Sequence, residues 1–177
     1  MNKTFLRRLI LTVGIALVLS ALVPMGRRAF AFAADAVSVT LNSKNATPRE
    51  VEETTQQAIT REYAAAWKAL ATALAENRTD VLPASFVGAQ REKLESQIAQ
   101  QKKAGLSTRI LDHGHQLDVV FYSPEGSAMQ LRDTADLSIE YRDGSRAVHS
   151  ENVKQHYVVL MTVAEDRWKV RLLQETD

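Results

Sequence analysis

Two histidines and one aspartate are the residues of this sequence best suited to chemistry. His113 and His115 form an H-x-H pair in a stretch of alternating apolar residues, so a strand would point both imidazoles to the same face. Imidazole titrates near neutral pH, which suits acid–base catalysis and metal binding. Asp133 interrupts an apolar strand face between Leu131 and Ala135. A carboxylate in such an interior can serve as a base, so these three residues are the candidate catalytic group.

Each of these residues also has a structural interpretation. Buried carboxylates are more often structural partners, and Asp133 could pair with a helix amide or an arginine. Histidines most often pack or face solvent. A metal bound by the two histidines would need a third ligand. Asp133, His149 and Glu151 are candidates, but the sequence does not place any of them beside the histidines. We therefore expect no metal centre and no cofactor. The sequence contains no H-E-x-x-H motif, glycine-rich phosphate loop or G-x-S-x-G motif.

Composition excludes several classes of protein. The 177 residues include no cysteine, which rules out disulfides, thiolate metal sites and cysteine nucleophiles. Residues 1–34 hold five basic residues and no acidic one, so the remainder has 17 basic and 21 acidic residues and a net charge of −4. Nucleic acids are bound chiefly through positive charge, so we do not expect a nucleic-acid partner.

The first 34 residues have the features of a signal peptide or membrane anchor. A short basic start precedes an uncharged apolar run over residues 9–25. Ala31, Phe32 and Ala33 form a small-x-small cleavage site, whereas Arg27 and Arg28 favour a retained anchor. The stronger positive charge before the run favours a cytoplasmic N-terminus. We therefore expect an exported, periplasmic or extracytoplasmic domain anchored in the inner membrane through residues 9–25.

Helical patterns occupy the middle of the chain. Residues 35–46 are interpreted as a tether that can add a short strand, and a long amphipathic helix is predicted over residues 47–76. Thr47 and Pro48 match a capped helix start. A short second helix is predicted from Thr79 and a third over residues 89–103, which ends at Gly105. The predicted inward stripe of the long helix comprises Ile59, Tyr63, Trp67, Leu70 and Leu74.

After Gly105 the apolar residues alternate with a period of two. Four long strands are predicted over residues 107–123, 127–142, 145–164 and 167–175, separated by short turns that require antiparallel neighbours. Strands of this length must bend, and we expect interruptions at 113–115 and 151–153. The predicted fold is α+β, with three N-terminal helices packed on a strongly bent, four-stranded antiparallel meander, preceded by a membrane-targeting helix.

This order of elements resembles the cone-shaped nuclear transport factor 2-like superfamily, which includes ketosteroid isomerase and polyketide cyclases. The resemblance covers a domain over residues 47–177 and depends on the aromatic pair Tyr63 and Trp67 and on a closing hairpin with Arg167, Trp168, Lys169 and Val170. The superfamily contains enzymes as well as binding and assembly domains, so the resemblance implies a fold without choosing a function.

We expect Tyr63, Trp67, Phe121 and Tyr141 to line the interior of the cone. The leading hypothesis is an exported, membrane-tethered, non-catalytic module that acts in protein assembly or binds a small apolar ligand. A homodimer or an envelope protein is the expected partner. The alternative is an isomerase or dehydratase that uses Asp133 with His113 or His115.

Overall fold

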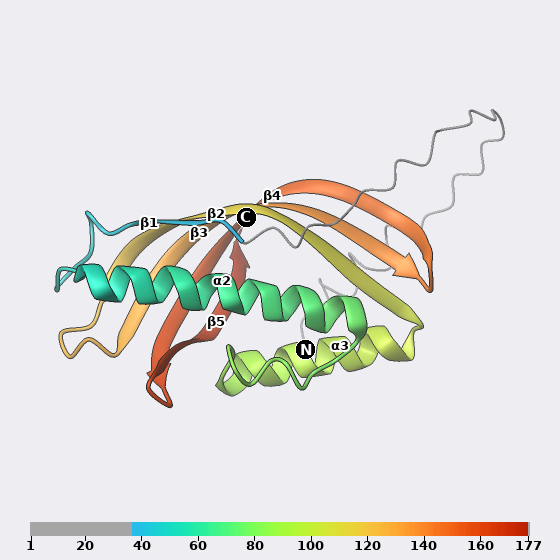
Figure 1. The fold of residues 1–177 in the computed structure, drawn as a ribbon, viewed down its shortest axis with the longest axis horizontal. Helices are drawn as coiled ribbons and strands as arrows, with labels where there is room; N and C mark the ends of the chain where they lie inside the picture. Colours follow the sequence, from blue (N-terminus) through green and yellow to red (C-terminus); the bar gives the residue numbers. More distant parts are fainter. Residues whose placement is uncertain (1–36, 177) are drawn as a thin grey trace. The chain divides into compact units, whose positions relative to one another are not determined.

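The computed structural model describes residues 37–176, in which two helices pack on one five-stranded sheet (Figure 1). The predicted membrane-targeting segment, including residues 9–25, lies outside the described residues. Neither helix in the described part is long and apolar enough to cross a membrane. The elements, in chain order, are β1 (Val39–Asn42), α2 (Glu53–Glu76), α3 (Gly88–Lys103), β2 (Leu106–Tyr122), β3 (Ala128–Asp143), β4 (Arg146–Ala164) and β5 (Arg167–Thr176).

The sheet has the strand order β1-β2-β3-β4-β5. Strands β2 to β5 form the predicted antiparallel meander. The predicted count of four strands is wrong, because β1 pairs in parallel with β2 and makes the sheet mixed. Val39 and Leu41 of β1 pack against the core, which explains why this short segment joins the sheet.

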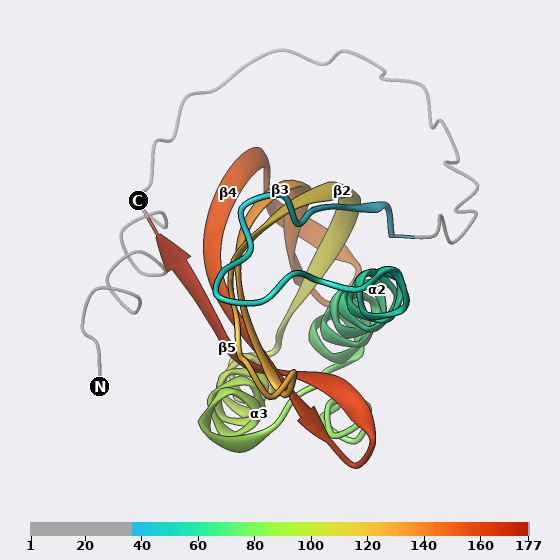
Figure 2. The same ribbon diagram turned by 90° about the vertical axis from the view of Figure 1, so that its left-hand side faces the viewer.

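Helix α2 lies on the concave side of the sheet, which curves around it (Figure 2). Its buried side chains include the predicted apolar stripe, and they are Ile59, Glu62, Tyr63, Ala66, Trp67, Leu70, Ala73 and Leu74. The predicted start at Thr47 is wrong, because its carbonyl oxygen accepts the amide of Tyr122 and so joins β2. The helix begins at Glu53 and ends before Asn77, whose left-handed backbone supplies the expected stop.

The predicted short second helix is absent from the described residues. Consecutive turns replace it, in which the Leu82 amide donates to the Thr79 carbonyl and the Ser85 amide to the Leu82 carbonyl. Pro83 has no N–H to donate and interrupts any helical ladder. Leu82 and Phe86 are nevertheless fully buried, so this segment fills the core beside α2 without being helical.

The long strands bend at register shifts. One shift lies between Asp112 and Gly114, which confirms the predicted interruption at residues 113–115. Residues 151–153 pair continuously with β3, so the interruption predicted there is wrong. The irregularity between β3 and β4 lies closer to the hairpin, at Tyr141 and Arg142. Each bulge adds one unpaired residue and reverses which side chains face the core, which determines the composition of the interior.

Candidate functional site

Four polar side chains form one hydrogen-bonded chain beneath α2. The Tyr63 hydroxyl donates to Oδ2 of Asp133 over 2.7 Å, and Nδ1 of His115 lies 2.8 Å from the same oxygen. The other ring nitrogen of His115, Nε2, lies 2.8 Å from Oδ2 of Asp112. Helix α2 supplies the tyrosine, β2 supplies Asp112 and His115, and β3 supplies Asp133. We call these four residues the polar network.

The bulge in β2 explains why Asp112 and His115 share a face. Asp112 lies opposite Leu137 and Gly114 opposite Asp136, which leaves His113 as the extra residue. Its imidazole contacts the hydroxyl of Ser138 at 2.7 Å on the outer face. The expectation that His113 and His115 point the same way is therefore wrong, because strict alternation does not survive a bulge.

Three of the four residues of the polar network are buried, and the side chain of Asp112 is 11% exposed. Tyr63 is 0% exposed, His115 2% and Asp133 1%. The ring of Trp67 lies 4.5 Å from the imidazole of His115, and the Tyr63 ring meets it edge-on at 5.4 Å. The two predicted aromatic residues of α2 therefore cover the histidine from the helix side.

The geometry makes His115 positively charged at neutral pH. A neutral imidazole can donate only one hydrogen bond, whereas both ring nitrogens here face carboxylate oxygens. Burial alone would lower the pKa of His115, but the hydrogen bonds and charges of Asp112 and Asp133 outweigh it and raise that pKa to about 9. Burial and the nearby charge of Asp133 raise the pKa of Tyr63 well above its usual value, so its hydroxyl stays protonated.

Three buried polar atoms around the network have no hydrogen-bond partner within the described residues. They are Oδ1 of Asp112, Oδ1 of Asp133 and Nε1 of Trp67.

No group of three or more His, Asp or Glu side chains in residues 37–176 is arranged to hold a metal. The apolar side chains Ile59, Leu117 and Leu131 that fill the surrounding core are at most 1% exposed. The network therefore sits in a packed interior.

The remaining predicted pocket residues do not join this group. A second register shift, between Val119 and Phe121, moves Phe121 to the outer face, where it is 38% exposed, and Tyr122 takes the buried position. Tyr141 lies half-buried near the β3–β4 hairpin and stacks on His149 at 5.9 Å. Asp112 was not predicted from the sequence, because its side chain faces the core only as a result of the bulge at His113.

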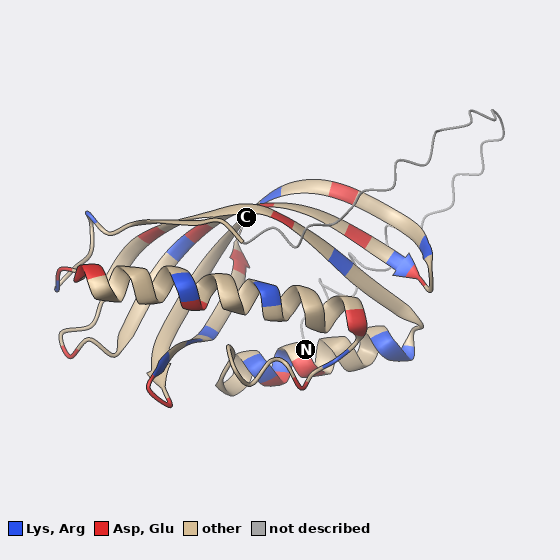
Figure 3. Ribbon diagram, in the orientation of Figure 1, with Lys and Arg blue, Asp and Glu red and all other residues tan. Residues whose placement is uncertain are grey.

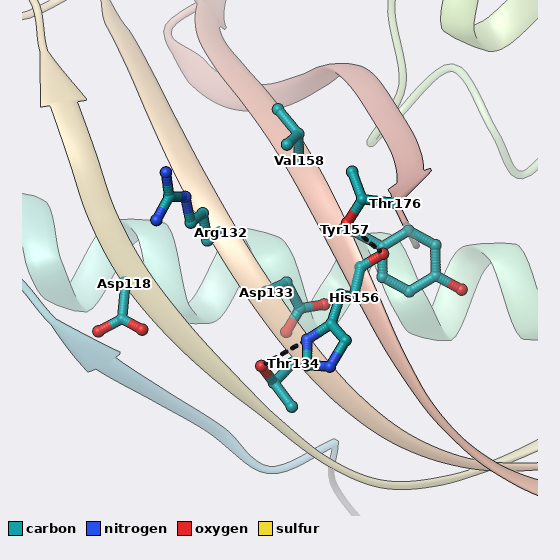
Figure 4. A pocket seen from close by; sticks show the side chains of 8 residues that line it. All are labelled: Asp118, Arg132, Asp133, Thr134, His156, Tyr157, Val158 and Thr176. Atoms are coloured by element: carbon teal, nitrogen blue, oxygen red, sulfur yellow. Dashed lines mark hydrogen bonds between the residues drawn. The ribbon is translucent and has the colours of Figure 1, made fainter.

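Two adjoining hollows lie on the outer face of the sheet. The larger has a volume of about 440 Å³ and the smaller about 300 Å³, and Asp118 and Arg132 line both. Figure 4 shows the larger one, where the Thr134 hydroxyl contacts Nδ1 of His156 at 3.1 Å. Both hollows are open, and Asp133 of the polar network is among the residues that line the larger one, so the chain presents an accessible sheet surface next to a buried polar network.

Comparisons with known proteins bear on the fold. No protein-family model matches the sequence, and no curated protein matches it. The structure is similar to the intermembrane-space region of the chloroplast protein ARC6, with a TM-score of 0.62 and 16% identity over 72% of this chain and 98% of that one.

Two further structures align less closely. One is a Novosphingobium aromaticivorans protein described as a scytalone dehydratase, with a TM-score of 0.47 and 14% identity over 70% of this chain and 85% of that one. The other is a Catenulispora acidiphila protein, with a TM-score of 0.45 and 12% identity over 70% and 95% of the two chains. The chain has a nuclear transport factor 2-like fold, which confirms the resemblance at the level of the fold.

Proposed function

We propose that this chain is a non-catalytic assembly module that binds another protein through its exposed sheet surface. The observation that carries the proposal is the closed polar network. Both ring nitrogens of His115 are occupied by carboxylates, and Trp67 lies across the imidazole. A substrate could reach Asp133 only if this packing opened, whereas catalytic carboxylates act from accessible clefts.

The same packing argues against a small apolar ligand in the cone. The core side chains Tyr63, Leu131 and Leu137 leave almost no exposed surface in the interior. Binding there would require side chains to move apart and would forfeit their contacts. Native mass spectrometry of the purified chain should therefore detect no small molecule that co-purifies with it.

Export and membrane anchoring belong to this proposal. The apolar run at residues 9–25 would hold the module at the inner membrane with the domain on the extracytoplasmic side. The similar region of ARC6 lies in an intermembrane space, which is consistent with an extracytoplasmic domain. A tethered module needs only an accessible surface, and the outer face provides one.

Site-specific photo-crosslinking in native membranes tests the assembly function. We would place benzoylphenylalanine at Phe121 or Ser150 on the exposed sheet and at Lys68 on the exposed side of α2 as the matched control. The proposal predicts a discrete heavier adduct from a sheet position and none from Lys68. Asp133→Asn should leave the adduct unchanged, because the proposal gives this carboxylate no part in binding the partner. Absence of an adduct from both sheet positions would contradict assembly through the sheet.

An isomerase or dehydratase is the second candidate, because Tyr63, His115 and Asp133 converge within 2.8 Å hydrogen bonds. The free Oδ1 of Asp133 would be the base, and His113 has no part because it lies on the other face. Such an enzyme would exchange the α-proton of a bound ketone with D₂O. Exchange by the full chain that is lost in Asp133→Asn would favour the enzyme over the assembly module.

A further inference from the structure

One edge of the sheet is unpaired over a long stretch. Strand β5 pairs with β4 from His156 to Ala164, so within residues 37–176 the segment 146–155 of β4 has no strand beside it on that edge. Figure 1 shows the β3–β4 hairpin extending well past the end of β5. Every residue from Arg146 to Asn152 is exposed. The backbone amides and carbonyls that point away from β3 are therefore available to another strand.

The opposite edge of this part of the sheet is less available. The side chain of Asn77 donates to the Leu106 carbonyl oxygen at 2.8 Å, and Thr108 donates to Gln101 at 2.6 Å. Most of residues 106–112 are half-buried beside the ends of α2 and α3. The structure thus covers the β2 edge with its own helices and leaves the β4 edge open.

The concave face beside the open edge is apolar at Val153 and only partly covered, whereas Glu151 and Gln155 of β4 make the same face polar on either side of it. Ile110 pairs with Ile139, Leu137 pairs with Val153, and all of these side chains belong to or pack against the core. Ile110, Ile139 and Val153 remain half-buried. A strand added next to β4 would place alternate side chains on this face and extend the row of Leu137 and Val153 by one strand, while Ile139 is separated from it by Glu151.

The outer face of the same edge carries an unused positive charge. Lys154 is exposed, and within the described residues it has neither an ion pair nor a hydrogen bond, although Asp136 lies opposite it on β3. An acidic residue on an added strand would lie directly beside it. Cross-strand pairs of opposite charge stabilise sheets by about 0.2–1 kcal/mol. Figure 3 shows charges of both signs on the neighbouring strands, so this lysine is a local feature rather than part of a basic surface.

We propose that the β4 edge at residues 146–155 binds an extended segment of a partner protein, with an apolar residue beside Val153 on its concave side and an acidic residue beside Lys154 on its outer side. The proposal rests on the assembly function proposed above and names the kind of partner. Main-chain hydrogen bonds supply the affinity, while the half-covered apolar face and Lys154 supply the specificity. The bulge at the hairpin end leaves Val148 as an extra residue of β4, so regular pairing with an added strand is expected from His149 onward.

A defined peptide tests the proposal on the full chain. The probe is fluorescein-labelled Thr-Val-Glu-Val-Glu-Val-Thr with blocked ends, and binding is measured by fluorescence anisotropy. We expect saturable binding that weakens roughly fivefold in Lys154→Glu, the equivalent of about 1 kcal/mol for one cross-strand pair. Lys68→Glu is the matched control and should bind as the native chain does. A peptide with lysine in place of glutamate should prefer the Lys154→Glu chain.

Backbone amide exchange locates the peptide. Protection should increase along residues 146–155 of β4 and stay unchanged around Arg132 and His156. No binding, protection confined to the outer hollow, or equal effects of Lys154→Glu and Lys68→Glu would overturn the proposal. A dimer by light scattering whose β4 edge is already protected without peptide would overturn it as well, in favour of a second copy. If crosslinks form at Phe121 while the peptide fails, the assembly function stands and this edge is not its site.

Discussion

At the scale of single residues, His115 is the group whose charge couples most directly to folding. Its folded pKa of about 9 lies above the ordinary value of 6.5, so folding favours the protonated ring. The stabilisation is complete below pH 6.5 and is lost as the pH rises through 9. The difference in pKa corresponds to about 3 kcal/mol.

Stability should follow this titration. We expect the free energy of unfolding, measured by urea denaturation, to fall by up to about 3 kcal/mol between pH 6.5 and pH 9.5. His115→Gln should be less stable at pH 6.5 and should lose this pH dependence. His113→Gln is the control, because His113 lies on the outer face. If the native chain and His115→Gln showed the same pH dependence, the charged-histidine interpretation would be wrong.

Tyr63 contributes through one buried hydrogen bond to Asp133. Tyr63→Phe should cost about 1–3 kcal/mol of unfolding free energy, since it leaves a buried carboxylate oxygen with one donor fewer. Tyr141→Phe is a matched control, because no hydrogen bond is found for its hydroxyl among the described residues and its side chain is only half-buried. Equal urea midpoints for the two variants would show that the Tyr63 hydroxyl contributes nothing.

At the scale of elements, the bulge in β2 selects which residues meet the core. Gly114 has φ of +141°, and a Cβ there would lie 3.5 Å from the Ser38 carbonyl oxygen of the segment before β1. Gly144 in the β3–β4 turn also has a positive φ, of +57°, but nothing lies within 4 Å of its added Cβ. An added Cβ would therefore find room at both glycines, and the backbone at Gly114, with its φ of +141°, is the conformation less accessible to other residues.

Replacing these glycines tests the bulge. Gly114→Ala should destabilise the chain by about 1–3 kcal/mol through backbone strain, and by more than Gly144→Ala, for which about 1 kcal/mol is expected. Thermal unfolding of the two variants measures the difference. A Gly114→Ala variant as stable as Gly144→Ala would indicate that the bulge is not constrained. The position of His115 beside Asp112 would then need another explanation.

Helix α2 supplies the packing that closes the polar network. Trp67 is 3% exposed and contacts His115 and Tyr157. Trp67→Ala should cost about 3–5 kcal/mol by calorimetry, because a large core side chain is lost and a cavity remains. The matched control is Lys68→Ala at the adjacent exposed position, with an expected change within about 0.5 kcal/mol. A small effect of Trp67→Ala would mean that the interior is already open.

The regular parts of these elements could be predicted from the sequence, as could the interruption at residues 113–115, but not which side chains that interruption turns toward the core. Periodicity indicated the inward stripe of α2 and the meander from β2 to β5. The stripe also predicted that Tyr63 and Trp67 would meet the sheet. The roles of Asp112, His113 and Phe121 depend on bulges that invert alternation, and no local pattern locates a bulge to one residue. The start of α2 was misplaced because Thr47 bonds to Tyr122, a contact distant in sequence.

At the scale of the whole molecule, the described domain combines a packed interior with an accessible sheet surface. Membrane attachment through residues 9–25 stays a prediction, because that segment lies outside the described residues. An alkaline phosphatase fused after residue 177 should be active if the domain is exported, whereas a cytoplasmic reporter at the same position should be inactive. The opposite pair of results would place the domain in the cytoplasm.

The most direct test of the closed interior is a ¹⁵N NMR titration of the His115 ring. We expect both ring nitrogens to stay protonated up to about pH 9 and their protons to exchange slowly with water. Asp133→Asn should lower that pKa by removing one of the two carboxylate charges. A ring that titrates near pH 6.5 with fast proton exchange would mean an accessible, open network, and it would contradict the non-catalytic assembly module proposed for this chain.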